Sequence, residues 1–374
     1  MRARILLAGA LALALHQARA LGQDYVWDLP RGFPPPRVPP TNPMSQAKVR
    51  LGRHLFYDRR MSVNGTQSCA SCHRQELAFT DGRATARGAT GQDHPRSAMS
   101  LVNVAYAGAL TWSNPNLRSL EEQALVPMLS EHPVELGLSG REHSFLRLLS
   151  ADPVYRALFF QAFSESKAPY TLANVAKALA AFERTIISAR SPYDLYHFGG
   201  DRGAISDSAQ RGEALFFGDE VAGCFRCHSG FNFSDGTVYL GSGYAAIPFH
   251  NTGLYNMPLT FSYPWPNVGI YQQTRNRADI GKFKTPSLRN VGLTAPYMHD
   301  GSVATLQDVL DHYAAGGRTI PSGPYAGRGH DNPYIDQRLT GFALTPQNRE
   351  DLLAFLQSLT DTELTRDPRF SSPW

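Results

Sequence analysis

The feature that most constrains this chain is a pentapeptide, Cys-x-x-Cys-His, which occurs twice and uses all four cysteines of the 374 residues. The two copies consist of Cys69, Cys72 and His73, and of Cys224, Cys227 and His228. This spacing attaches a c-type heme covalently, because the two thiols bond to the heme vinyl groups and the adjacent histidine becomes the proximal iron ligand. A single copy would also suit a redox dithiol or half of a zinc site. Two copies with no spare cysteine favour two covalently bound c-type hemes.

The other axial ligands of the two irons decide what such hemes do. A six-coordinate heme carries electrons, whereas an iron with an open position reacts with peroxide or oxygen. The methionines that could supply a thioether ligand are Met44, Met61, Met99, Met128, Met257 and Met298. Spacing alone does not select among these and the remaining histidines, so both an electron carrier and an enzyme stay open at this point.

The N-terminus has the pattern of a secretory signal peptide over residues 1–20. Arg2 and Arg4 precede an apolar run of 11 residues, and Ala18-Arg19-Ala20 fits the cleavage rule. The run is too short to span a bilayer, which argues against the alternative of an uncleaved anchor. Cleavage removes three arginines and no acid, which lowers the formal net charge from +4 to +1. We therefore predict an exported, periplasmic protein with no membrane span after cleavage and, without any basic cluster, no nucleic-acid partner.

A weak internal repeat divides the rest of the chain. In each copy a Gly-x-x-Leu-aromatic-aromatic segment, LGRHLFYD or RGEALFFGD, precedes the cysteine motif. Repeated units of this kind indicate duplicated domains, and the turn-rich stretch 191–206 is typical of a boundary. We predict a Pro-rich segment over residues 21–44, an N-terminal heme domain over 45–200 and a C-terminal heme domain over 201–374.

Hydrophobic periodicity indicates a mainly helical chain. Apolar stripes predict helices over residues 45–56, 172–187 and 345–359, and strand signals are few. Residues 30–43 hold seven prolines, which favours an extended lead-in that is not part of the core. The predicted fold is mainly α, with two cytochrome c-like heme domains and long irregular loops.

Longer stretches resemble the bacterial diheme cytochrome c peroxidase and MauG family. They are LGRHLFYD with NGTQSCASCH, EEQALVPML followed by PVEL, FHNTGL, and KFKTPSLRNVGLTAPYMHDGSVATLQDVL. The resemblance extends from about residue 48 to about residue 359, which is nearly the whole mature chain. The proline-rich lead-in and the NGTQSCASCH variant are most similar to the MbnH-type branch, which is associated with methanobactin clusters.

At the first heme, the resemblance implies a peroxide-reacting iron held by His73. Its distal side would be formed by Gln123, Pro127 and Glu135, from the EEQALVPML and PVEL stretches. A carboxylate at that place moves a proton between the peroxide oxygens and promotes O–O cleavage. Trp112 matches the tryptophan that lies between the two hemes in this family and relays electrons between them.

Peroxidases of this family often carry a distal histidine on a loop after the first heme, and this ligand must leave for activation. The aligned position here is Ala89, and the nearby His94 is out of register. The resemblance therefore implies a five-coordinate first heme that reacts without reductive activation.

At the second heme, the resemblance makes His228 the proximal ligand and Tyr313 the distal ligand of the iron. Typical peroxidases have a methionine at the position of Tyr313, in the helix after PYMHDGS, whereas MauG has a tyrosine. A thioether raises the heme potential and suits electron transfer, and a phenolate favours higher oxidation states. The alternative is that Tyr313 is a core residue and that His312 or another residue binds the iron.

The family usually binds a calcium ion between the hemes, and the resemblance places its ligands here at Ser97, Thr294 and Pro296. Ser97 replaces an asparagine, and a hydroxyl is a weaker calcium ligand than an amide carbonyl, so this substitution weakens the expectation of one bound Ca²⁺. MauG also has a surface tryptophan before its second heme motif. Ala222 and Gly223 stand there in this chain, which implies a different protein substrate.

The resemblance as a whole implies a periplasmic enzyme in which hydrogen peroxide produces a high-valent state shared by two hemes. This state would oxidise an aromatic residue of a partner protein at long range, in the MbnH-type branch a tryptophan to kynurenine on an MbnP-type protein. One alternative is a diheme cytochrome c peroxidase that reduces peroxide with electrons from a small redox protein. Another is a non-catalytic diheme electron carrier.

Overall fold

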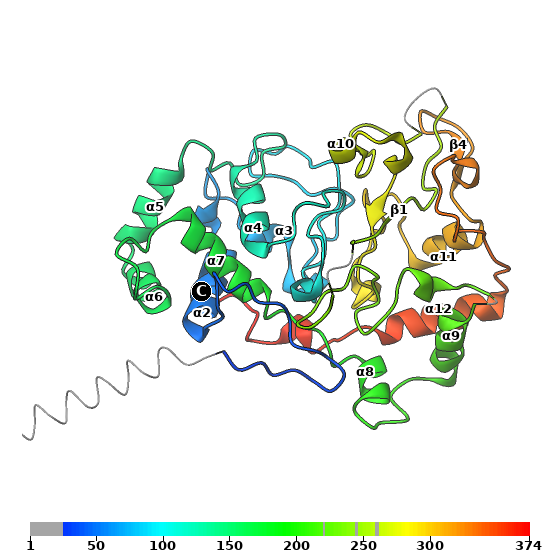
Figure 1. The fold of residues 1–374 in the computed structure, drawn as a ribbon, viewed down its shortest axis with the longest axis horizontal. Coiled ribbons are helices and arrows are strands. Elements are labelled where there is room, and N and C mark those ends of the chain that lie inside the picture. Colours follow the sequence, from blue (N-terminus) through cyan, green and yellow to red (C-terminus); the bar gives the residue numbers. More distant parts are fainter. Residues whose placement is uncertain (1–24, 220, 244–245, 259–261) are drawn as a thin grey trace, which may run out of the picture.

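The computed structural model describes residues 25–219, 221–243, 246–258 and 262–374 (Figure 1). The signal peptide predicted at residues 1–20 lies outside them. Within the described residues the chain forms eleven α-helices and two small antiparallel sheets, which confirms the mainly α fold. No helix in this part of the chain is long and apolar enough to cross a membrane.

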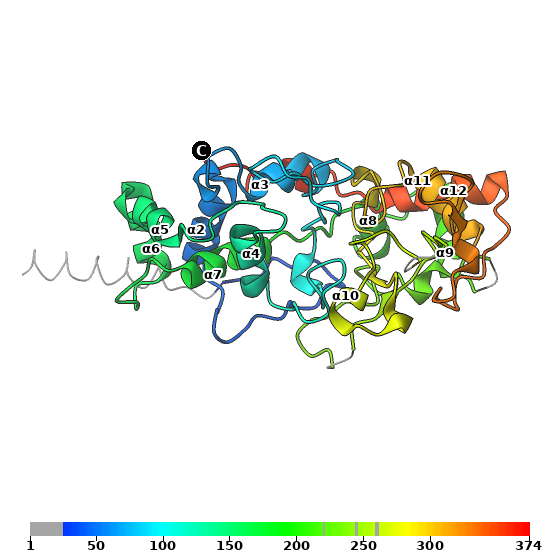
Figure 2. The ribbon, with the colours of Figure 1, turned by 90° about the horizontal axis from the view of Figure 1, so that it is seen from above.

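The helices form two lobes that lie side by side along the longest axis of the molecule (Figures 1 and 2). The N-terminal lobe contains α2 (Gln46–Tyr57), α3 (Cys69–Cys72), α4 (Leu120–Leu129), α5 (Glu142–Ala151), α6 (Pro153–Ala162) and α7 (Leu172–Glu183). The C-terminal lobe contains α8 (Pro192–His197), α9 (Asp207–Phe217), α10 (Tyr271–Thr274), α11 (Leu306–Ala314) and α12 (Pro346–Ser358). In the same lobe β1 (Phe249–His250) pairs with β2 (Phe283–Lys284), and β3 (Thr319–Ile320) pairs with β4 (Gly327–Arg328).

Two of the three predicted helices match α2 and α12 within one residue at each end. The residue before each helix explains where it begins. The side chains of Ser45 and Thr345 each accept a hydrogen bond from a backbone amide of the first turn. Such caps satisfy amides that have no partner within the helix.

The third helix, α7, ends at residue 183 rather than at residue 187 as predicted. The Thr185 hydroxyl donates to the carbonyl of Phe182 at 2.6 Å, so a side chain takes up a backbone acceptor. The carbonyl of Ile186 accepts instead from the amide of Asn103, at 2.8 Å, in another segment. This tertiary pairing draws the backbone out of the helix, although the apolar stripe continues.

The internal repeat corresponds to one helix crossing that is built twice. In α2, a Cβ on Gly52 would lie 1.9 Å from the carbonyl oxygen of Ala178 in α7. In α9, a Cβ on Gly212 would lie 1.9 Å from the carbonyl oxygen of Asp351 in α12. The glycine of each repeat therefore lets two helix backbones touch, and the first aromatic residue that follows, Phe56 or Phe216, is buried in the core beside the crossing.

The end of the chain does not stay in the C-terminal lobe. Leu364 and Phe370 are buried in the core cluster that α2 and α7 build around Leu51 and Leu55. The Tyr57 hydroxyl donates to the carbonyl of Phe370 at 2.5 Å, and the C-terminus lies beside α2 (Figure 1). The predicted domain of residues 201–374 is therefore corrected at its end, because its last residues complete the N-terminal core.

The proline-rich lead-in also departs from expectation, because it takes part in a core. Phe33 is buried against Tyr106 of the N-terminal lobe and Phe231 of the C-terminal lobe, with ring centroids 6.2 Å and 4.9 Å away. The Tyr106 hydroxyl donates to the carbonyl of Pro34 at 2.8 Å. Proline prevents regular structure here, but one aromatic side chain is enough to anchor the segment across both lobes.

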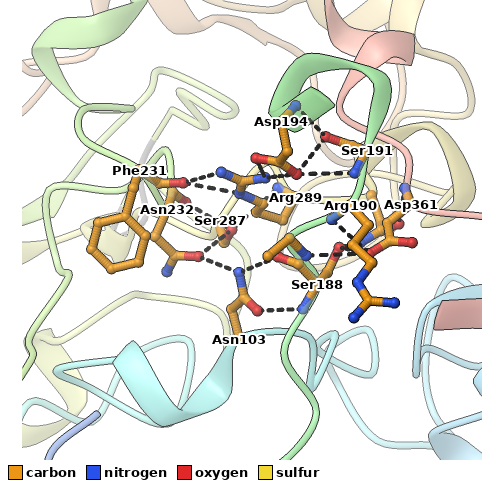
Figure 3. Close-up of polar contacts among 12 residues, drawn as sticks. Asn103, Ser188, Arg190, Ser191, Asp194, Phe231, Asn232, Ser287, Arg289 and Asp361 are labelled. Atoms are coloured by element: carbon orange, nitrogen blue, oxygen red, sulfur yellow. Dashed lines mark hydrogen bonds and ion pairs between the residues drawn. The ribbon is translucent and has the colours of Figure 1, made fainter. Parts of the chain in front are cut away.

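A buried polar network joins the lobes (Figure 3). The guanidinium of Arg289 lies 2.6 Å from the carboxylate of Asp194 and donates to the carbonyl of Phe231 at 2.9 Å. The side chains of this ion pair are 0% and 3% exposed. The amide of Asn103 donates to the side-chain oxygen of Asn232 at 3.1 Å. Arg289 of the SLRN stretch thus ties α8 to the backbone of Phe231 within the C-terminal lobe, and the bond from Asn103 to Asn232 links this network to the N-terminal lobe.

Candidate functional site

The two cysteine motifs share one local geometry. Nδ1 of His73 lies 2.9 Å from the carbonyl oxygen of Phe79, and Nδ1 of His228 lies 3.0 Å from that of Phe233. Because a carbonyl only accepts, each Nδ1 carries the proton and each Nε2 keeps its lone pair for a metal. Phe79 and Phe233 have φ of 60° and 49°, a left-handed conformation that bulky residues rarely adopt. The same strained turn therefore presents both histidines as candidate iron ligands.

The four cysteines are free thiols. Burial raises the pKa of Cys72 and of Cys227 to about 11 and that of Cys224 to about 12. Burial likewise raises the pKa of Cys69. Thiols that hold their protons this strongly are poor nucleophiles, which argues against the redox-dithiol alternative.

The second motif borders a cavity of about 490 Å³. Cys224, Cys227, His228 and Tyr313 line this cavity together with an apolar wall of Phe216, Leu306, Val309, Leu352 and Leu356. Two thiols, a free imidazole nitrogen and an apolar wall fit a c-type heme. Ala222 and Gly223, which stand where MauG has its surface tryptophan, line the cavity as well.

Tyr313 and His312 lie differently with respect to this cavity. Tyr313 is among the residues that line it, and His312 is not. His312 is buried, and neither of its ring nitrogens has a hydrogen-bond partner among the described residues. Burial, together with the nearby cysteines, raises the pKa of the Tyr313 phenol well above its usual value, so only a bound cation would make it a phenolate. Met99 and Met298 also line the cavity.

The first motif borders a smaller hollow of about 50 Å³. The structure brings to it every residue assigned to the first heme and its distal side, namely Cys69, Cys72, His73, Gln123, Pro127 and Glu135. Gln123 and Pro127 lie on α4, and the carbonyl of Pro127 accepts from the amide of Leu136 at 2.9 Å. This bond ties the segment that carries Glu135 to the helix. At this site the donor set, rather than the volume, indicates a heme.

Three titratable side chains share the hollow. Burial raises the pKa of Glu135 to about 7, so this carboxyl group exchanges its proton near neutral pH. Burial raises the pKa of Glu183, on α7, to about 8, and its Oε2 has no hydrogen-bond partner. His94 lies with its Nε2 3.7 Å from Oε1 of Glu135. Neither Glu183 nor His94 was selected from the sequence, and His94 was set aside because it is out of register with the family's loop histidine.

Trp112 lies where the lobes meet. Its indole Nε1–H donates to the carbonyl of Ser97 at 3.0 Å, and its own carbonyl accepts from the amide of Lys284 at 3.0 Å. The ring packs in a cluster with Tyr297 and Met298 and lines the large cavity. An indole at this junction is placed to contact groups that belong to either lobe.

The three residues proposed for calcium also come together. Ser97, Thr294 and Pro296 all line the large cavity. The Ser97 hydroxyl donates to the carbonyl of Met298 at 3.2 Å. None of the three residues carries a carboxylate, so the oxygen ligands that they offer are neutral.

The FHNTGL stretch fastens the segments around the second motif. His250, on β1, lies with Nε2 2.7 Å from Asp235 and Nδ1 2.7 Å from Asp336. Burial alone would lower the pKa of His250, but the adjacent carboxylates raise it. The residue therefore links acidic side chains from two separate loops, and the guanidinium of Arg338 also lies 2.8 Å from its Nδ1.

Comparison with known proteins gives consistent matches. A model of the di-haem cytochrome c peroxidase family matches residues 46–202. The chain is 38% identical to the cytochrome-c peroxidase IdrP1 of Denitromonas iodatirespirans, covering 96% of this chain and 93% of that protein. It is 35% identical to the methylamine utilization protein MauG of Methylorubrum extorquens, over 88% and 82% of the two chains. A crystal structure of a MauG-like protein associated with microbial copper homeostasis superposes with a TM-score of 0.91 at 46% identity, covering 94% of this chain and 99% of that one.

Proposed function

This chain belongs to the diheme cytochrome c peroxidase and MauG family, and on that premise we propose that it uses hydrogen peroxide to oxidise an aromatic residue of a partner protein. Members of this family are heme-dependent oxidoreductases, and the family implies heme as the cofactor. The modified residue that we propose is a tryptophan, and the product is kynurenine.

The observation that carries the proposal is Tyr313 in the cavity of the second motif. A peroxidase that draws electrons from a small redox protein needs a second heme of high potential, which a methionine ligand provides. A phenolate instead stabilises oxidised iron, so the second heme would store oxidising equivalents rather than deliver electrons. His312, the alternative ligand, does not line the cavity.

Bound at the two motifs through Cys69, Cys72, Cys224 and Cys227, two c-type hemes would supply the redox chemistry of peroxide reduction. The chain's own residues would supply proton transfer and electronic contact. Glu135 is placed to take a proton from one peroxide oxygen and return it to the other, and Gln123 offers an amide to orient the same molecule. Trp112 would connect the two centres, because its indole lies where the lobes meet.

The similarity at 46% identity to a MauG-like protein associated with microbial copper homeostasis supports the MbnH-type branch and an MbnP-type partner. We propose that the protein acts in the periplasm after cleavage of residues 1–20. A folded partner protein cannot enter either cavity, so its tryptophan would lose electrons over a distance. One Ca²⁺ at Ser97, Thr294 and Pro296 remains a prediction that these neutral oxygens favour only weakly.

A second candidate function is peroxide reduction with electrons from a small redox protein. The 38% identity to the cytochrome-c peroxidase IdrP1 favours it. A pure electron carrier is disfavoured, because it has no use for a carboxyl group buried beside the first motif whose pKa lies near 7.

One experiment separates these functions. The ferric holoprotein receives one equivalent of hydrogen peroxide, and optical and EPR spectra are recorded over time. Our proposal expects a high-spin first heme and a long-lived near-infrared absorption that reports charge shared between the hemes. Two low-spin hemes that do not respond to peroxide would identify an electron carrier.

The variant Tyr313→Met then tests whether Tyr313 is the distal ligand of the second heme iron. We expect it to lose the long-lived near-infrared absorption, because a thioether no longer stabilises the oxidised iron. Tyr325→Met makes the same exchange at a tyrosine that is 46% exposed and serves as the control. Persistence of the absorption in Tyr313→Met would show that Tyr313 is not the ligand.

A further inference from the structure

The loop of residues 86–96 folds against the segment that carries Glu135. Within the loop, the amide of His94 donates to the carbonyl of Ala86 at 2.6 Å. Towards its neighbour, the amide of Ala89 donates to the carbonyl of Glu135 at 2.7 Å, and the side chain of Gln92 accepts from the amide of the preceding residue 134 at 2.9 Å. These bonds hold the loop and the Glu135 segment in one register.

The space between the two segments leaves no room for another side chain. A Cβ on Gly88 would lie 1.8 Å from the carbonyl oxygen of Val134. The backbone of the loop therefore packs directly against the backbone of the Glu135 segment. This close packing places the imidazole of His94 beside the carboxyl group of Glu135.

The hydrogen bonds of His94 determine which ring nitrogen carries the proton. The backbone amide of Arg96 donates to Nδ1 at 3.2 Å, so Nδ1 must keep its lone pair. In the neutral ring the proton then sits on Nε2, the nitrogen that faces Oε1 of Glu135 at 3.7 Å. Burial, aided by the nearby Arg96, lowers the pKa of His94 to about 4, so the ring is neutral at physiological pH.

We propose that His94 is a positioning residue for Glu135, which presents its Nε2–H to the carboxylate and holds it in place to exchange a proton with peroxide. This inference rests on the proposed function for its purpose, but the placement of Nε2 opposite Oε1 at 3.7 Å stands without it. This distance is longer than a hydrogen bond, and the proposal requires the two atoms to close to hydrogen-bond distance when Glu135 carries its negative charge.

Other charged and titratable groups around the hollow do not replace His94. They are Arg87 from the same loop, Cys69, Cys72 and His73 from the first motif, and Glu183 from α7. Arg87 is half-exposed and lies 3.9 Å from Asp93, and Glu183 is neutral below pH 8. The imidazole is thus a neutral donor whose Nε2 faces the Glu135 carboxyl group at 3.7 Å.

The test follows the protonation of Glu135 in the resting ferric holoprotein, without peroxide. The carboxyl C=O stretch is titrated by infrared difference spectroscopy and is assigned by its loss in Glu135→Gln. The donor-free variant His94→Leu, with His94→Phe as a second choice if it does not fold, should raise the midpoint of this titration by about one pH unit, because the carboxylate loses a hydrogen bond. His94→Gln keeps an N–H donor and should remain close to the wild-type midpoint.

His143→Leu is the matched control, because His143 is an exposed residue of α5. The proposal would be overturned if the titration midpoint of His94→Leu equalled that of this control. It would also be overturned if a folded His94→Gln had the same raised midpoint as His94→Leu. EPR spectra of the same samples show whether His94 binds the first heme iron. A low-spin first heme that becomes high-spin in His94→Leu would make His94 an iron ligand instead. If the midpoints move as expected while the wild type does not react with peroxide, the proposed function fails and the pairing of His94 with Glu135 stands.

Discussion

At the scale of single residues, burial turns ordinary side chains into reactive ones. Glu135 is a common surface residue type, yet in the small hollow its pKa rises to about 7 because the charged form is poorly solvated. The orientation of each motif histidine depends on one contact in the same way, since a carbonyl accepts a hydrogen bond from its Nδ1–H and leaves Nε2 free. The residue type alone therefore does not define the roles of Glu135 and the motif histidines, which depend on the groups that surround each side chain.

The pKa of Glu135 predicts how the reaction with peroxide depends on pH. The carboxylate form accepts the proton, so the second-order rate constant should rise with pH through a midpoint near 7 and then level off. Glu135→Gln has no proton to exchange, so its rate should not depend on this titration and should be about 10²- to 10⁴-fold below the wild-type plateau. Stopped-flow spectra of the ferric holoprotein measure both effects. A flat profile in the wild type, or an unchanged rate in Glu135→Gln, would remove Glu135 from proton transfer.

At the scale of elements, a pair of crossed helices supports each motif. α2 crosses α7 beside the first motif, and α9 crosses α12 beside the second, with a glycine at the contact in both cases. The cysteine motifs follow α2 and α9 along the chain after short connecting segments, so each crossing lies beside the motif of its own lobe. This arrangement explains why the repeat comprises a glycine, a leucine and two aromatic residues.

Gly52→Ala tests this element. In an exposed helix the change would stabilise by about 1 kcal/mol, because alanine has the higher helix propensity. Here the new methyl group would meet the carbonyl oxygen of Ala178 at 1.9 Å, and we expect a net loss of about 1–3 kcal/mol in the free energy of unfolding. Urea unfolding of the holoprotein measures the change. The control is Gly243→Ala, because a Cβ there meets nothing within 4 Å, and equal stability of the two variants would contradict the assignment.

At the scale of the whole molecule, the lobes are joined by several segments that are distant in sequence. The proline-rich lead-in inserts Phe33 between them, and the C-terminal tail returns to α2. The buried ion pair of Arg289 and Asp194 lies within the C-terminal lobe beside these contacts. Because Trp112 lies at the same junction, the relative placement of the lobes also controls the contact between the two candidate heme sites.

Arg289→Met tests how much this buried ion pair contributes to stability. The variant leaves the Asp194 carboxylate buried without its partner, which should cost about 3–5 kcal/mol of unfolding free energy. Arg349→Met removes an exposed partner of Asp311 and should change stability much less. Thermal unfolding of the two holoproteins, followed by circular dichroism, compares them. Similar melting temperatures would show that the buried pair does not stabilise the packing of α8 in the C-terminal lobe.

Much of the site could be predicted from the sequence, because the residues that carry its chemistry are close neighbours along the chain. The spacing of Cys69, Cys72 and His73 predicts heme attachment by itself, since a covalent motif needs no tertiary contact to be identified. The helices of residues 45–56 and 345–359 were predicted within one residue because their caps and apolar stripes are local. Gln123, Pro127 and Glu135 came from the family resemblance, and the structure gathers them around one hollow.

Only the tertiary structure decided what surrounds those residues. His94 and Glu135 are 41 positions apart, and their contact depends on backbone bonds between two loops that no periodicity or motif reveals. The same holds for Phe370, which is assigned to the second half by sequence order but is buried in the first core. The sequence by itself determined the two heme motifs, their helices and the family. The fold decided the pKa of Glu135, the role of His94 and the union of the lobes, because burial and distance exist only once the chain has packed.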